Sequence, residues 1–135
     1  MPKPPFALEG LDHVVLLVDD MDAATRFYTE VIGCTVDRAV PEYGMLQLRA
    51  GAALIDLVAC TSAEGAWAKP EVEGGRNMDH VALATGPWDP DALRAHLAAH
   101  DVEIVEEGMR YGARGDGYSV YVLDPSGNTI ELKGY

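Results

Sequence analysis

Residues 11–16 read LDHVVL, and almost the same stretch, MDHVAL, returns at residues 78–83. A second short stretch is also repeated, since LIDL at residues 54–57 is matched by TIEL at residues 129–132. Each half of the chain therefore carries one histidine near the start of a predicted strand and one carboxylate in its last predicted strand. This repetition predicts two copies of one supersecondary unit.

The first half is predicted to fold as a strand, a helix and three further strands. Residues 13–18 are β-branched and apolar on both faces, as in a largely buried strand. Asp19 and Asp20 offer N-caps to a helix with apolar residues at helical spacing, and Gly33 ends it as a left-handed C-cap. The following strands are predicted over residues 35–40, 45–49 and 53–59.

The second half repeats this order after a segment without periodicity. We expect residues 11–60 and 78–135 to be the two modules of a single domain, joined by a linker or lid at 61–77 and preceded by an extension at 1–10. In the second module, a strand at 81–85 and a helix opened by Asp89 and Pro90 are predicted. Three strands at 102–105, 118–123 and 129–133 follow, with a polar, glycine-rich loop at 108–117.

Two imidazoles and two carboxylates at equivalent places in a duplicated fold form a donor set that suits a divalent metal ion. Glu131 alternates with two apolar neighbours in its strand, so its carboxylate points away from them and needs a partner if it is buried. The predicted ligands are His13, Asp56, His80 and Glu131.

Composition narrows the classes of partner. The chain has 135 residues, 48% of them hydrophobic, which is enough for one compact domain. A net charge of −12 without a basic stretch argues against nucleic acid and anionic membranes as partners, so we expect a small-molecule ligand.

No run has the length of a membrane span and the start lacks the apolar stretch of a signal peptide, so a cytoplasmic protein is expected. Cys34 and Cys60 have no metal-binding spacing and are expected to be free buried thiols.

These motifs resemble the vicinal oxygen chelate superfamily, which includes glyoxalase I, fosfomycin and bleomycin resistance proteins, methylmalonyl-CoA epimerase and extradiol dioxygenases. The similarity runs from Leu11 to Tyr135 and is strongest in DHVA at residues 79–82 and in SVYVLDPSGNTIEL at residues 119–132. It implies an α+β fold in which two tandem βαβββ modules form a curved mixed sheet around a metal-binding cleft. It also implies a homodimer, in which the cleft is sometimes built from both chains.

The resemblance also assigns roles to residues. Glu131 occupies the position of the family's last ligand, whereas Asp56 stands where similar glyoxalases have a longer glutamate. Asp56 therefore ligates directly, acts through a water, or is simply a strand-end carboxylate held by the protein. In fosfomycin-type relatives, the pair that matches Ser119 and Tyr121 faces the substrate, and Arg114 is a candidate clamp for a carboxylate or phosphonate.

The activity implied is that of a lactoylglutathione lyase or a related isomerase. One divalent ion per site, Zn, Ni, Mn, Co or Fe(II), would bind two vicinal oxygens of the substrate and stabilise an enolate or oxyanion, with Glu131 or Asp56 moving the proton. Three alternatives remain open: a metal-free, drug-sequestering protein of the bleomycin-resistance kind, an inactive member, and a fosfomycin-type thiol transferase. Dioxygenase chemistry is less favoured, because those enzymes are about twice as long.

Overall fold

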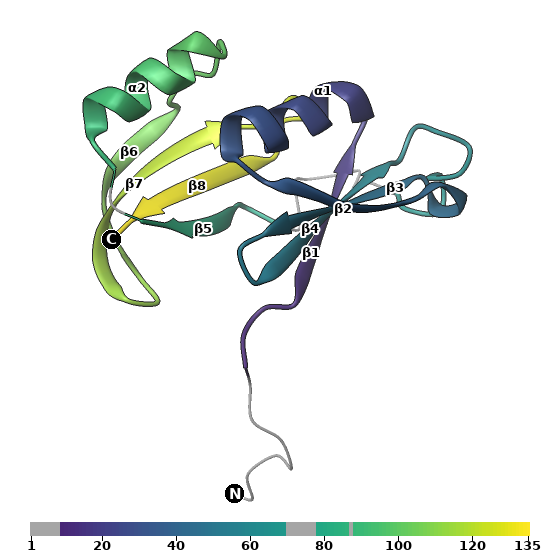
Figure 1. The fold of residues 1–135 in the computed structure, drawn as a ribbon, viewed down its shortest axis with the longest axis horizontal. Helices are drawn as coiled ribbons and strands as arrows, with labels where there is room; N and C mark the ends of the chain where they lie inside the picture. The colour runs from purple at the N-terminus through teal and green to yellow at the C-terminus, as the bar shows by residue number, and fades with distance from the viewer. Residues whose placement is uncertain (1–8, 70–77, 87) are drawn as a thin grey trace, which may run out of the picture.

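The chain folds into two modules of the same βαβββ order, each built on its own four-stranded mixed sheet (Figure 1). The structure is a computed structural model, and it describes residues 9–69, 78–86 and 88–135. The first module contains β1 (His13–Val18), α1 (Met21–Arg26), η1 (Phe27–Ile32), β2 (Thr35–Val40), η2 (Pro41–Tyr43), β3 (Met45–Ala50) and β4 (Ala53–Ala59). The second contains β5 (Val81–Thr85), α2 (Pro90–Ala99), β6 (Glu106–Gly112), β7 (Gly115–Leu123) and β8 (Thr129–Gly134).

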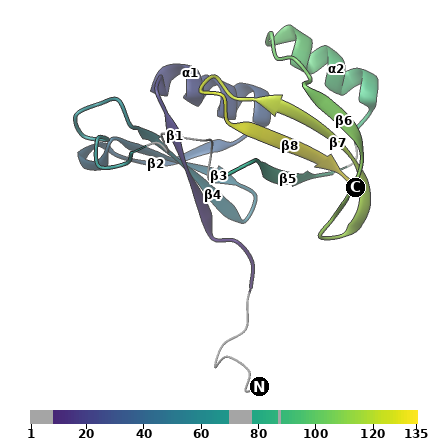
Figure 2. The same ribbon diagram turned by 180° about the vertical axis from the view of Figure 1, so that it is seen from behind.

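Both sheets have the same topology. Their strand orders are β1-β4-β3-β2 and β5-β8-β7-β6, and in each sheet the first strand of the module runs parallel to its last strand. No strand pairing joins the two sheets within the described ranges, so the single curved sheet that was expected is two separate sheets in one chain. The helices α1 and α2 lie over the same side of the molecule, as the two opposite views show (Figures 1 and 2). No helix in the described part of the chain is long and apolar enough to cross a membrane.

The first helix begins and ends where the sequence predicts, but it changes type halfway. The Asp20 carboxylate accepts the backbone N–H of Ala23 at 3.0 Å, and Gly33 closes the helix with a left-handed φ of 95°. After α1, the chain continues as the wider π-helix η1. Two consecutive residues at the start of η1, Phe27 and Tyr28, are both buried in the core.

The second half differs from the prediction at one element. Residues 102–105 form no strand, although Val102 and Ile104 pack against the core. The predicted loop at 108–117 is instead the hairpin of β6 and β7, in which Gly112 pairs with Gly115 around a two-residue turn. The prediction of a loop was wrong because the glycines that suggested it serve another purpose. They lie in strands, at places where other parts of the chain come too close for a side chain. A Cβ at Gly117, for example, would lie 2.3 Å from the carbonyl oxygen of Gly134.

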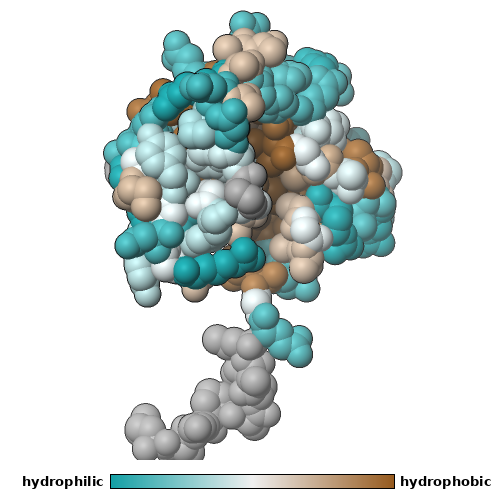
Figure 3. Space-filling model, turned by 60° about the vertical axis from the view of Figure 1, so that its left-hand side comes forward, coloured by the Kyte–Doolittle hydropathy of each residue, from teal (hydrophilic) through white to brown (hydrophobic). Residues whose placement is uncertain are grey.

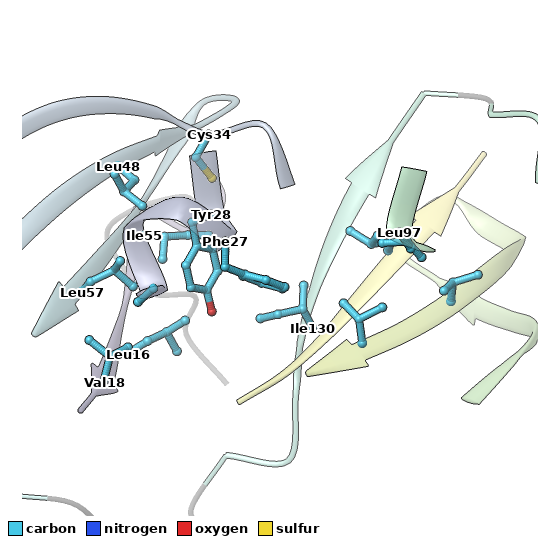
Figure 4. Packing of buried hydrophobic residues seen from close by; sticks show 14 residues of the cluster. Leu16, Val18, Phe27, Tyr28, Cys34, Leu48, Ile55, Leu57, Leu97 and Ile130 are labelled. Atoms are coloured by element: carbon cyan, nitrogen blue, oxygen red, sulfur yellow. The ribbon is translucent and has the colours of Figure 1, made fainter. Parts of the chain in front are cut away.

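A buried polar cluster connects the two modules. The turn after β7 carries Asp124, whose carboxylate accepts the Tyr28 hydroxyl of the first module at 2.8 Å. The same carboxylate accepts the backbone N–H groups of Ser126 and Asn128 and the Asn128 side-chain amide. That amide also donates to the carbonyl oxygen of Leu17 in β1. Beside this cluster, Phe27 points toward Ile130 of the second sheet, so apolar packing and hydrogen bonds act at the same junction (Figure 4).

Replacing Asp124 tests this junction. Asp124→Ala is expected to lower the free energy of unfolding by about 3 kcal/mol, because the Tyr28 hydroxyl and two backbone amides lose their buried acceptor. The matched control, Asp116→Ala in the exposed part of the β6–β7 hairpin, is expected to change it by less than about 0.5 kcal/mol. Urea denaturation of both variants measures the difference, and equal losses would show that the cluster does not hold the modules together.

Candidate metal-binding half-sites

The predicted ligands lie on the faces of the two sheets that point away from the helices. In the first sheet, Leu16, Ile55 and Leu57 belong to the core beside α1, so the alternation of the strands places His13 and Asp56 on the opposite face. In the second sheet, Ile130 and Leu132 belong to the core and Glu131 lies on the opposite face, opposite Tyr121 of β7. Each module therefore presents one histidine and one carboxylate on the same side of its sheet. We call His13 and Asp56 the first half-site, and His80 and Glu131 the second half-site.

The second half-site is closely bonded. The Nε2 atom of His80 lies 3.1 Å from Oε1 of Glu131, and the Ser119 hydroxyl donates to Oε2 of Glu131 at 2.6 Å. The rings of His80 and Tyr121 meet edge to face at 5.5 Å between centroids. The predicted residues Ser119 and Tyr121 thus lie beside Glu131, as the alternation along β7 predicts.

The environment keeps Glu131 in its charged form. Burial, with only 5% of the residue exposed, acts to raise the pKa of its carboxyl. Hydrogen bonds from Ser119 and Tyr121 and the charges of His80 and Lys133 outweigh that effect, so the pKa lies below its ordinary value. Tyr121 is affected in the opposite sense: burial first, and then the Glu131 carboxylate, raise the pKa of its hydroxyl.

The first half-site contains a buried carboxylate with a hydrogen bond to only one of its two oxygens. Asp56 is 3% exposed, and its Oδ2 accepts the side-chain amide of Gln47 at 3.2 Å. Gln47 is held in turn by Arg38, whose Nε donates to its Oε1 at 2.6 Å. Within the described residues, Oδ1 of Asp56 has no hydrogen-bond partner although it is buried. Such an atom is costly unless a cation or a donor completes it.

In both modules, the residue before the histidine orients the imidazole. Nδ1 of His13 lies 2.7 Å from the Asp12 carboxylate, and Nδ1 of His80 lies 2.8 Å from the Asp79 carboxylate. The hydrogen bond that His13 donates to the Asp12 carboxylate raises the pKa of His13; desolvation opposes this effect and the charge of Asp56 adds to it. A proton held on Nδ1 leaves the lone pair on Nε2, which is the usual arrangement of a metal-binding histidine.

The two half-sites do not meet within one chain. No group of three or more His, Cys, Asp or Glu residues in the described ranges is close enough to hold a metal ion. Nor does any predicted ligand line the groove of about 830 Å³ on the helix side, between α1–η1 and the segment after α2. Arg114 lies apart as well, at the turn of the β6–β7 hairpin, with its guanidinium 5.3 Å from the ring of Tyr135.

Four polar neighbours were missed by the sequence analysis. Gln47 and Arg110 follow from register. Counting back from the turn at Gly51 places Gln47 opposite Asp56. Counting back from the turn at Ala113 places Arg110 on the face of Glu106, four residues from it, and Glu106 lies opposite Tyr121. The other two, Asp12 and Asp79, belong to the quoted repeat itself. Their repetition before each histidine was the signal that could have identified them.

The unpartnered Asp56 oxygen leads to a test of stability. In the metal-free protein, Asp56→Asn is expected to leave the free energy of unfolding unchanged or raise it by about 1 kcal/mol, because a poorly satisfied buried carboxylate is removed. Asp124→Asn is the matched control, since it changes an equally buried aspartate whose hydrogen bonds are complete, and it is expected to destabilise. Thermal unfolding after chelation measures both, and an equal loss in the two variants would mean that Asp56 is structural.

Comparison with known proteins identifies the family. The profile of the Glyoxalase/Bleomycin resistance protein/Dioxygenase superfamily matches residues 10–132. The chain is 31% identical over 129 residues to the virulence protein STM3117 of Salmonella typhimurium, covering 95% of this chain and 85% of that protein. It is 29% identical over 141 residues to the glyoxalase domain-containing protein RDO1 of Mycosarcoma maydis, covering 96% of this chain and 70% of the relative.

Solved structures agree with this assignment. An integron cassette protein from the mobile metagenome of V. cholerae superposes with a TM-score of 0.72 at 27% identity, covering 96% of this chain and 98% of that chain. The crystal structure of STM3117 superposes with a TM-score of 0.68 at 28% identity, covering 96% of this chain and 99% of that chain. The repeated histidine and carboxylate motifs, the paired βαβββ modules and the profile match all agree, and the chain therefore belongs to the glyoxalase/bleomycin resistance/dioxygenase superfamily, also called the vicinal oxygen chelate superfamily.

Proposed function

We propose that this protein is a metal-dependent lyase or isomerase of the glyoxalase kind, acting on a small substrate with two vicinal oxygens. The observation that carries the proposal is the pair of equivalent half-sites, each with one oriented histidine and one buried carboxylate on the same face of its sheet. A buried carboxylate with a free oxygen, such as Asp56, is a poor element of a purely structural core.

The residues fit a divalent cation. Nε2 of His13 is available, Nε2 of His80 faces Oε1 of Glu131 at 3.1 Å, where a cation would lie between them, and Asp56 supplies a second hard oxygen donor. This set is suited to Zn, Ni, Mn, Co or Fe(II). A bound ion of this kind supplies Lewis-acid stabilisation of an oxyanion or enolate. Its positive charge would also complete the unpartnered Oδ1 of Asp56 and offset the burial of two carboxylates.

We further propose that each complete site is shared between two copies of the chain, with His13 and Asp56 from one copy and His80 and Glu131 from the other. One chain by itself keeps these pairs apart. Four strands, β1, β2, β5 and β6, are sheet edges in the described chain, and such edges are normally covered. Hydrophobic residues also gather in a hollow between the two halves on the side seen in Figure 3, as expected of a surface that pairs.

Within this site, the two carboxylates have different parts. Glu131 is fixed by His80 and Ser119, so it serves as a positioned donor. Asp56 is held by the protein through Oδ2, and its Oδ1 would accept a proton from the carbon next to the substrate carbonyl when it is not engaged by the cation. The Tyr121 hydroxyl lies beside Glu131 and would turn from that carboxylate to donate to a developing oxyanion, and Arg114 at the hairpin turn remains a candidate clamp.

A metal-free protein that sequesters a drug in the same fold is the second candidate. The unpartnered Asp56 oxygen speaks against it, because sequestration gives no reason to bury a carboxylate without a partner. The experiment on metal binding separates the two functions.

Metal binding is expected at one divalent ion per pair of half-sites. Glu131→Ala should abolish tight binding, because it removes the best-positioned carboxylate, whereas Asp56→Ala should weaken binding by about tenfold without eliminating it. Elemental analysis of the purified protein and calorimetric titration of the metal-free protein measure both effects. Retention of no ion, and only weak millimolar binding on titration, would favour sequestration instead.

Sharing of the site is tested by mixing two variants that each lack one of the two histidines. His13→Ala and His80→Ala are each expected to lose tight metal binding, yet their mixture should regain one intact site per heterodimer, since each copy supplies the histidine that the other lacks. Light scattering at micromolar concentration gives the mass, and tagged subunits report exchange. A monomeric mass, or no recovery despite proven exchange, contradicts the shared site.

A further inference from the structure

A row of polar side chains crosses the first sheet at Asp56. Asp56 of β4 lies directly opposite Gln47 of β3, and Gln47 lies directly opposite Arg38 of β2, the edge strand of this sheet (Figure 1). Residues that pair directly across neighbouring strands present their side chains on the same face of a sheet. Arg38 and Gln47 therefore share the face that carries the first half-site.

One extra residue in β2 brings Arg38 into this row. The register between β2 and β3 shifts between Val36 and Arg38, so Asp37 is an additional residue in β2. A bulge of this kind re-aims the side chains that follow it. In an unbroken register Asp37 would stand opposite Gln47, whereas its carboxylate is paired with Arg49 at 3.1 Å. The bulge thus places a hydrogen-bond donor, and not a second carboxylate, beside Gln47.

Arg38 fixes which way the Gln47 amide points. Nε of Arg38 donates to Oε1 of Gln47 at 2.6 Å, and Nε2 of Gln47 donates to Oδ2 of Asp56 at 3.2 Å. A guanidinium only donates and a carboxylate only accepts, so turning the amide over would break both hydrogen bonds. The hydrogen bonds therefore run in one direction, from Arg38 through Gln47 to Asp56, and each polarises the next.

This chain of hydrogen bonds engages one oxygen of Asp56 and leaves the other open. Gln47 occupies Oδ2, whereas Oδ1 is buried without a hydrogen-bond partner in the part of the chain that the structure describes. The hydrogen bond also fixes the orientation of the carboxylate plane. A carboxylate held in this way meets a cation through its second oxygen alone and not through both.

The second module has a donor in the equivalent place. Tyr121 of β7 lies directly opposite Glu131, as Gln47 lies opposite Asp56, and Tyr121 is hydrogen-bonded to the Glu131 carboxylate. The two donors are chemically different, one a phenol and the other an amide. The modules therefore share a hydrogen-bond donor that faces the carboxylate from the third strand, although they do not share the residue type.

We propose that Gln47 is a positioning residue of the proposed metal site, and that Arg38, acting through Gln47, makes Asp56 a ligand through one oxygen. The inference rests on the proposed function and deepens it by assigning the residues that hold the first half-site in place. Groups that hydrogen-bond to a metal ligand orient it and raise the affinity for the ion. Arg38 also repels a nearby cation through its charge, so the proposal requires its effect on position to outweigh that repulsion.

The two possible roles of Arg38 predict changes of opposite sign in metal affinity. If Arg38 positions Asp56, Arg38→Met should weaken the binding of Zn or Co(II) by about tenfold, and Gln47→Met, which removes the donor itself, by at least as much. If Arg38 acts only through its charge, Arg38→Met should tighten binding. Calorimetric titration of the full-length protein measures the affinity.

Two further variants complete this titration. Arg49→Met is the matched control, because it removes the same charge from the same sheet and breaks only the pair with Asp37, so it should not weaken binding. Arg38→Lys keeps a charged donor and should recover part of the loss. Arg38 is exposed, so Arg38→Met carries the test even if Gln47→Met loses its fold, and circular dichroism checks each variant.

A second measurement uses the metal-free protein. The side-chain amide signals of Gln47 are followed by NMR and assigned by their loss in Gln47→Met. Arg38→Met and Asp56→Ala should each shift these signals, because each removes one of the two hydrogen bonds that fix the amide. Arg49→Met should leave them in place.

The outcomes separate this inference from the proposed function. Weaker metal binding in Arg38→Met and Gln47→Met, with no loss in Arg49→Met, supports the positioning role. Unchanged or tighter binding in Arg38→Met overturns that role and leaves the proposed function intact, as do Gln47 amide signals that do not respond to Arg38→Met. Absence of metal binding in the wild type rejects the proposed function, and the positioning role with it.

Discussion

The geometry of the molecule depends on one buried carboxylate, Asp124. A carboxylate is tolerated in a protein interior only when its lone pairs are occupied, and Asp124 accepts four hydrogen bonds. One of them comes from Tyr28 of the first module, while Asn128 beside it donates to β1. Burial and the Asp124 charge both raise the pKa of the Tyr28 hydroxyl, which therefore stays protonated as a donor. The position of each half-site relative to the other within a chain follows from this contact.

Most of the fold was predictable because its signals are local. Caps such as Asp20, the left-handed Gly33 and the alternation in β1 and β4 act over a few residues, and the repeat allows each module to support the prediction for the other. The β6–β7 hairpin was not predictable in this way. Its glycines are typical of a loop when the sequence is read alone, but they make room for atoms that are distant in sequence. A Cβ at Gly112, for example, would lie 2.5 Å from Cε of Lys133.

For the candidate site, too, the local features could be predicted from the sequence and the long-range ones could not. The histidines and carboxylates were predicted from residue type and repetition, and the structure places Ser119 and Tyr121 beside Glu131 as alternation predicts. Whether these residues bind metal or substrate stays a prediction. Gln47 and Arg110 were missed because their positions depend on hairpin register, which is set by two strands and the turn between them and not by either strand alone. The separation of the half-sites could not be predicted from the repeat, since two equal modules can meet within a chain or between chains.

The two half-sites are similar in sequence but unequal in energy. Ser119, Tyr121 and His80 take the place of water around the Glu131 carboxylate. The free-energy cost of burying Glu131 is therefore compensated within its own module. Asp56 accepts one hydrogen bond, from the Gln47 amide, and its Oδ1 is buried without a partner among the described residues. Part of the free-energy cost of burying Asp56 therefore stays uncompensated until a cation binds. A cation that joins the half-sites would thus satisfy the buried oxygen of Asp56, whereas at Glu131 it would meet a carboxylate that its own module already holds in position. In the proposed site, the same inequality leaves Asp56 an oxygen that can accept a proton and holds Glu131 in position as a ligand.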